Sequence, residues 1–143
     1  MEYLAIPYTH KDEEVMNFRA EVSDFIFSEL SKEGRIIYAP ISSCHHIAIE
    51  HGLPRNYEFW EKMCEAFIGA SKKIIVICLP GWETSTGVTA ELKLAKGRGL
   101  EVEYLDPTPY LEVLGYEGVS SAGIGVPSRT RRNRTQLQCR GYA

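Results

Sequence analysis

The segment GWETSTGVTAE, residues 81–91, holds the residues whose types and spacing best fit a chemical site. Ser85, Thr86 and Gly87 stand where a helix is predicted to begin, and free backbone N–H groups and the positive end of a helix dipole favour an anion there. Glu91 follows one turn later, where the same dipole favours an ionised carboxylate, the form that a nucleophile needs. The segment therefore predicts an anion site beside a carboxylate nucleophile. It has neither a Walker A pattern nor GxGxxG.

A plainer interpretation of the same segment stays open. Ser85 or Thr86 is then only the N-cap of the helix, and Glu91 is a solvated residue on its surface. Spacing alone does not separate the two interpretations.

Three histidines and a cysteine lie between residues 44 and 51 and form a weaker candidate. Cys44, His45, His46 and His51 suggest a metal-dependent hydrolase, but their spacing is not that of a standard zinc site. We therefore favour a loop histidine that contacts a ligand or caps local structure, and we predict no metal site.

Composition and charge limit the function classes. The net charge of −3 combines five arginines and no acid in residues 128–143 with 11 basic and 19 acidic residues elsewhere. Because the predicted folded part is acidic, we expect no nucleic-acid surface on it. The four cysteines form no CxxC pair, which favours reduced thiols in the cytoplasm. Neither a signal peptide nor a membrane span is predicted.

The elements that must position these residues alternate along the chain. Apolar runs predict strands at residues 3–6, 35–41, 74–79 and 102–105, and apolar spacings of three and four predict helices at 10–34, 57–70 and 87–96. Residues 42–56 are interpreted as a loop with short helical turns, and residues 110–114 as a short final helix. The helix at 57–70 is expected to pack through one side that holds Phe59, Trp60, Met63, Ala66, Phe67 and Ala70. Its aromatic residues Tyr57, Phe59 and Trp60 fit packing better than stacking on a base. This order predicts an α/β three-layer sandwich with a central parallel sheet of four to five strands, flavodoxin- or Rossmann-like. We expect one domain over residues 1–115 and a disordered basic tail over 116–143.

Ligands of such sheets bind beyond the carboxyl ends of the strands. Residues 7–10, 40–43, 80–86 and 106–107 are predicted to meet at that edge, so the site is expected there.

The segments YLAIPYTH, APISSCHH and STGVTAELKLAKGRGLEVEYLD together resemble the nucleoside 2-deoxyribosyltransferase-like superfamily. The stretches YEFW and LPGWETSTGV are closer to a branch of it that is common in bacteria and phages. The resemblance covers about residues 3–107. It implies an enzyme that cleaves the N-glycosidic bond of a nucleoside or nucleoside monophosphate by transfer or hydrolysis, without a cofactor, as a homodimer or larger homo-oligomer. Glu91 would be the nucleophile, and Ser85 and Gly87 would hold the 5′-phosphate or 5′-hydroxyl. Tyr8 would contact the ligand, while Ser42 and His45 would border the base.

One position departs from the superfamily pattern. Its members usually carry an aspartate on the helix before the central strand, and that position falls at Cys64 here. A thiol does not replace a carboxylate in acid–base work at its usual pKa. Glu61 and Glu65 are the candidates to take over this role. If neither does, we expect a non-catalytic module that binds a nucleotide without turnover.

Overall fold

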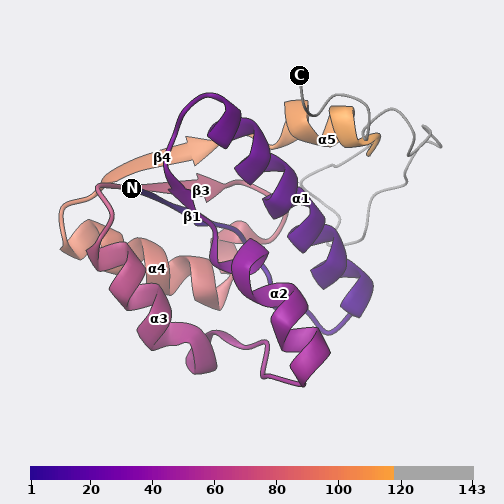
Figure 1. Ribbon diagram of the computed structural model, residues 1–143, viewed down its shortest axis with the longest axis horizontal. Helices are drawn as coiled ribbons and strands as arrows, with labels where there is room; N and C mark the ends of the chain where they lie inside the picture. The colour runs from indigo at the N-terminus through magenta and orange to yellow at the C-terminus, as the bar shows by residue number, and fades with distance from the viewer. Residues whose placement is uncertain (118–143) are drawn as a thin grey trace.

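The computed structural model describes residues 1–117 and has an α/β fold (Figure 1). Its four-stranded parallel sheet has the strand order β2-β1-β3-β4. The strands are β1 (Glu2–Ala5), β2 (Ile37–Tyr38), β3 (Lys73–Ile77) and β4 (Glu101–Leu105). The helices are α1 (Glu13–Lys32), α2 (Pro40–His51), α3 (Tyr57–Gly69), α4 (Thr86–Gly97) and α5 (Thr108–Leu114), with a short 3₁₀ turn at Trp82–Thr84. The predicted three-layer, flavodoxin-like sandwich is confirmed.

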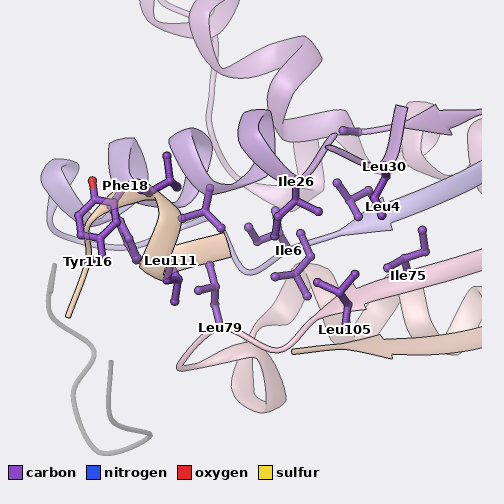
Figure 2. Close-up of a cluster of buried hydrophobic side chains, with 14 residues drawn as sticks. Leu4, Ile6, Phe18, Ile26, Leu30, Ile75, Leu79, Leu105, Leu111 and Tyr116 are labelled. Atoms are coloured by element: carbon purple, nitrogen blue, oxygen red, sulfur yellow. The ribbon is translucent and has the colours of Figure 1, made fainter. Parts of the chain in front are cut away.

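Alternate residues of the two central strands face opposite layers, as the two-residue period of a strand requires. Leu4 of β1 and Ile75 of β3 face α1 and α5, in a cluster that Figure 2 shows. Tyr3 and Ile74 face α3 and α4 instead. Since β1 and β3 are buried on both faces, they read as continuous apolar runs, which is typical of central parallel strands.

The second strand and the segment after it differ from the prediction. The strand predicted over 35–41 is only Ile37–Tyr38, and the loop predicted over 42–56 contains the twelve-residue helix α2. Pro40 stands in the first turn of α2, where its missing N–H costs nothing and its fixed φ favours the helix. Because this proline opens the helix, the apolar residues on either side of it belong to two different elements.

The buried side of α3 is also shifted from the predicted side. Cys64 and Ile68 are its fully buried residues, with Trp60 and Phe67 partly buried beside them. Phe59, which we had placed on the buried side, is half exposed. The run of apolar residues in this helix is wider than the side that it buries, so spacing alone placed that side about one position off.

The described part of the domain ends just after α5. Tyr116 packs edge-on against Phe18 of α1, with ring centroids 4.8 Å apart, and its hydroxyl donates to Glu21. The predicted disordered tail, 116–143, lies outside the described residues except for its first two positions. No helix within residues 1–117 is both long and apolar enough to cross a membrane.

Candidate functional site

A cavity of about 660 Å³ lies beyond the carboxyl ends of β1 and β3. The loops after these two strands line it together with α2, α3 and the first turns of α4. In the order β2-β1-β3-β4 the chain leaves β1 in one direction and continues from β3 in the other, so the cavity is at the topological switch point of the sheet. Its volume is in the range of small-molecule sites, roughly 300–1,000 Å³.

Glu91 lies on the buried side of α4 and lines this cavity. It shares that side with Val88 and Ala95, which are spaced three and four residues away, and it is only 6% exposed. The hydroxyl of Tyr3, on β1, donates a hydrogen bond of 2.7 Å to Glu91 Oε1. Glu91 therefore lies at a helix position whose spacing from Val88 and Ala95 places it on the buried side. The interpretation of Glu91 as a solvated surface residue is wrong.

Burial sets the charge of this carboxyl group. It raises the pKa of Glu91 to about 7, and the hydrogen bonds from Tyr3 and Cys64 oppose that rise only in part. Burial and the nearby Glu91 also raise the pKa of the Cys64 thiol to about 12. Cys64 therefore stays a neutral thiol near pH 7, while Glu91 is divided between its neutral and ionised forms.

Ser85 caps α4 at the rim of the cavity. Its side chain accepts a hydrogen bond of 3.3 Å from the N–H of Val88, so the capping role is real. Gly87, in the first turn, packs under the ring of Tyr57, where an added Cβ would lie 3.5 Å from the ring. Ser85, Thr86 and Gly87 all line the cavity, as the anion-site interpretation requires.

Tyr8 and His45 meet at another part of the cavity wall. The Tyr8 hydroxyl and His45 Nδ1 are 2.5 Å apart, with Tyr8 in the loop after β1 and His45 on α2. Burial lowers the pKa of His45 and raises that of Tyr8, so both groups are neutral near pH 7. Both residues line the cavity, and their contact with a ligand stays a prediction.

Two predicted residues do not reach the cavity. The hydroxyl oxygen of Ser42 lies 2.8 Å from that of Ser23 on α1, and Ser42 is not among the α2 residues that line the cavity, such as Cys44, His45 and Ala48. Glu65 is likewise absent from the wall, which α3 lines with residues such as Trp60, Glu61 and Cys64. Of the two predicted substitutes for the missing aspartate, only Glu61 lines the cavity.

Arg19 of α1 is the most unusual of the residues that the sequence did not reveal. It is 5% exposed, lines the cavity, and donates to the backbone oxygens of Tyr8, Thr9 and Pro80 at 3.2–3.3 Å. Gly81 has a φ of 92° and leaves room for this guanidinium, since a Cβ there would lie 3.1 Å from Nη2. Arg19 thus ties together the two loops that follow the central strands. The sequence did offer one signal for this residue, because Arg19 lies among the apolar residues on the buried side of the helix predicted at 10–34.

Aromatic side chains make up much of the remaining wall, and sequence reasoning had assigned those of α3 to packing. Tyr38, Tyr57 and Trp60 all line the cavity. The Tyr57 hydroxyl is a fully buried polar atom without a hydrogen-bond partner, the only such side-chain atom within residues 1–117.

The histidines of α2 do not assemble a metal site. His45 faces the cavity, whereas His46 is 74% exposed and lies 3.8 Å from Asp24. No group of three or more His, Cys, Asp or Glu side chains in the described part of the chain is arranged to hold a metal ion. Within residues 1–117 the structure therefore contains no set of metal ligands that would support a metal-dependent hydrolase built on His45, His46 and His51.

Comparison with known proteins gives one family. The model of a family described as a domain of unknown function, DUF1937, matches residues 1–106, which span all four strands and the whole cavity wall. A search of curated proteins finds no match to the chain.

Proposed function

We propose that this chain, which belongs to the DUF1937 family, binds a nucleoside or nucleoside monophosphate and cleaves its N-glycosidic bond. Glu91 is the nucleophile that attacks C1′ of the sugar. One observation carries the proposal: a single carboxyl group is buried in the cavity wall at the switch point, held by a hydroxyl and without a cation beside it within residues 1–117.

The surroundings of Glu91 suit displacement at a sugar carbon. A carboxylate nucleophile forms a glycosyl–enzyme intermediate through an oxocarbenium-like transition state, and an ion-paired carboxylate would be less available for this. Tyr3 holds Glu91 Oε1 at 2.7 Å and Cys64 also donates to this carboxyl group, so two neutral donors fix its orientation in the cavity wall. With a pKa of about 7, a substantial share of Glu91 is ionised at neutral pH.

The rest of the wall suits a nucleoside. Tyr8, Tyr38, Tyr57 and Trp60 supply aromatic surface for a base or sugar. The first turn of α4, with Ser85 as its cap, supplies free N–H groups for a 5′-phosphate or 5′-hydroxyl.

The test incubates the protein with a panel of 2′-deoxynucleosides and their 5′-monophosphates and measures the released free base by chromatography. Wild-type protein should release base from at least one substrate, and Glu91→Gln should lower the rate by at least about 1,000-fold, as expected when a nucleophile is removed. Glu65→Gln is the matched control, because Glu65 carries the same group on a helix of the site but does not line the cavity. Absence of release by wild type, or equal release by Glu91→Gln, contradicts the proposal.

A second candidate function is nucleotide binding without turnover, and Cys64 favours it. A neutral thiol with a pKa of about 12 stands where the resembling superfamily has an acid, so no carboxyl group at that position can protonate the leaving base. Calorimetry that gives micromolar binding of a substrate that the protein does not cleave would support this candidate. Measurable turnover would exclude it.

We also propose a cytoplasmic location and a homo-oligomer. Cys44, Cys64 and Cys78 are free thiols, which suits a reducing compartment. Ile47 of α2 and Phe59 of α3 are half exposed on two helices that line the cavity, where a second copy could cover them. Light scattering tests the oligomer.

A further inference from the structure

We propose that His45 donates the proton that the departing base requires, and that Tyr8 resupplies this proton through His45 Nδ1. This inference rests on the proposed function, which leaves the source of that proton open. His45 is thereby a catalytic residue that touches the base, and Tyr8 is a positioning residue that acts through it.

The contact between the two side chains is the first support. The Tyr8 hydroxyl lies 2.5 Å from His45 Nδ1, and the two rings meet edge to face with centroids 5.5 Å apart. Both residues line the cavity that Glu91 also lines, although they come from the loop after β1 and from α2. The nucleophile and this pair therefore face one ligand volume from different elements.

The protonation states select one arrangement of hydrogens. Burial raises the pKa of Tyr8 and lowers that of His45, so the phenol keeps its proton and the imidazole is neutral. When the Tyr8 hydroxyl donates to Nδ1, the imidazole hydrogen must be on Nε2. Arg55 lies beside the phenol and favours its ionised form, which lets Tyr8 give up the proton during the reaction.

The second nitrogen of His45 has no hydrogen-bond partner among residues 1–117. Within residues 1–117 only the Tyr57 hydroxyl is both fully buried and without a hydrogen-bond partner, and Nε2 has no protein partner of its own. Nε2 therefore keeps accessible surface, although the residue is only 5% exposed. His45 lines the cavity, and the proposal places that surface toward the ligand volume.

The step balances in atoms and charge. As a Glu91 oxygen bonds to C1′, the bond from C1′ to the base breaks, and the base takes the Nε2 proton. The Tyr8 proton moves to Nδ1 and leaves a phenolate beside Arg55. Water then attacks C1′ and releases Glu91, and the proton of that water returns through Nε2 and Nδ1 to Tyr8.

The experiment compares two substrates that differ in their need for a proton. One is a 2′-deoxyguanosine compound with the 5′ group that the panel identifies, and the other is its N7-methyl derivative, whose base already carries a positive charge and leaves without protonation. For a pyrimidine-specific protein, the deoxyuridine compound and its 5-fluoro derivative, whose base leaves more readily as an anion, serve the same purpose.

His45→Gln should lower kcat/KM by about 100-fold or more on the unmodified substrate, in the range for loss of a general acid, and by less than about 5-fold on the activated one. Tyr8→Phe should follow the same pattern with a smaller loss, and it keeps the test valid if the histidine variant does not fold. The matched control is His51→Gln, because His51 is an exposed histidine at the end of the same helix and does not line the cavity. It should change neither rate.

The outcomes separate this inference from the proposed function. Equal losses on both substrates mean that His45 and Tyr8 only pack or bind, and they overturn the inference while the proposed function stands. If wild-type protein releases base from neither substrate, both are overturned. Loss on the unmodified substrate alone supports both.

Discussion

The two ends of the sheet differ in whether their charged side chains form ion pairs. At the amino ends of the strands, the side chain of Arg35 donates to Glu2 at 2.7 Å and to Glu103 at 2.9 Å. Lys73 lies 3.1 Å from both Glu101 and Glu103. Each cation there has at least two carboxylates as neighbours, so this end of the sheet is a network of opposite charges.

The carboxyl ends of the same strands carry charges without such partners. Within residues 1–117 Glu91 has no cation and Arg19 has no carboxylate at ion-pairing distance, although both are more deeply buried than every member of the network. Their partners are a hydroxyl, a thiol and backbone oxygens. A buried charge without a counterion is costly, and such costs are concentrated at functional sites. The contrast therefore assigns stability to one end and ligand chemistry to the other.

The largest expected effect is on the pH dependence of stability at Glu91. Its pKa is about 7 in the folded protein against an ordinary value of 4.5, so folding is favoured by the protonated form. The contribution is complete below about pH 4.5 and is lost as the pH rises through about 7, by on the order of 3 kcal/mol in total. Urea unfolding of wild type and Glu91→Gln at pH 5 and pH 8 should show a variant that matches wild type at pH 5 and exceeds it at pH 8.

Glu103 is the control from the other end of the sheet and should show the opposite sign. Burial raises the pKa of Glu103, but hydrogen bonds from Arg35 and Lys73 outweigh this and lower it. Glu103→Gln should therefore lose stability relative to wild type near neutral pH, and the difference should shrink as the pH falls below the ordinary range of a carboxylate. Parallel pH curves for the two variants would refute the contrast between the ends.

The next largest effect is the loss of stability when Arg19 or Arg35, one at each end of the sheet, is replaced. Arg19→Met removes three hydrogen bonds to the loops after β1 and β3, and we expect a loss of about 2 kcal/mol, because relief of the buried charge offsets part of the bonding. Arg35→Met should cost less, about 1 kcal/mol, because its ion pairs are partly solvated, and this cost should decrease at 1 M salt. Unfolding by denaturant at low and high salt measures both. A larger loss for Arg35→Met contradicts the contrast.

The sequence predicts the sheet well because its strands carry their own signal. The apolar runs at 3–6 and 74–79 and the helix periods around them were enough to order the layers and to bring Glu91 to the ligand edge. Helix α2 was missed because its residues alternate small, polar and apolar types without a clear period, and only Pro40 marks its start. Ser42 was misplaced for the same reason: the side of a helix cannot be assigned before the helix is recognised.

The partners of the site residues were beyond the reach of local patterns. Tyr3 reaches Glu91 across 88 positions of sequence, and Tyr8 reaches His45 across 37. Each contact depends on how strands and helices cross in space. Sequence spacing thus predicted that Glu91 lies at the ligand edge of the sheet, whereas its pKa and its hydrogen-bond donor required the packed structure.

The smallest expected effect concerns Tyr57, which tests whether the carboxyl end is built for a ligand more than for stability. Its hydroxyl is fully buried without a partner, while the ring packs over Gly87 at the start of α4. Removing an unsatisfied buried hydroxyl is neutral or favourable, so Tyr57→Phe should match wild type in free energy of unfolding or exceed it by up to about 1 kcal/mol. Tyr38→Phe, at another aromatic position of the wall, is the comparison. Urea unfolding at pH 7 decides the matter, and a loss above about 1 kcal/mol for Tyr57→Phe would show that the hydroxyl already stabilises the protein without ligand.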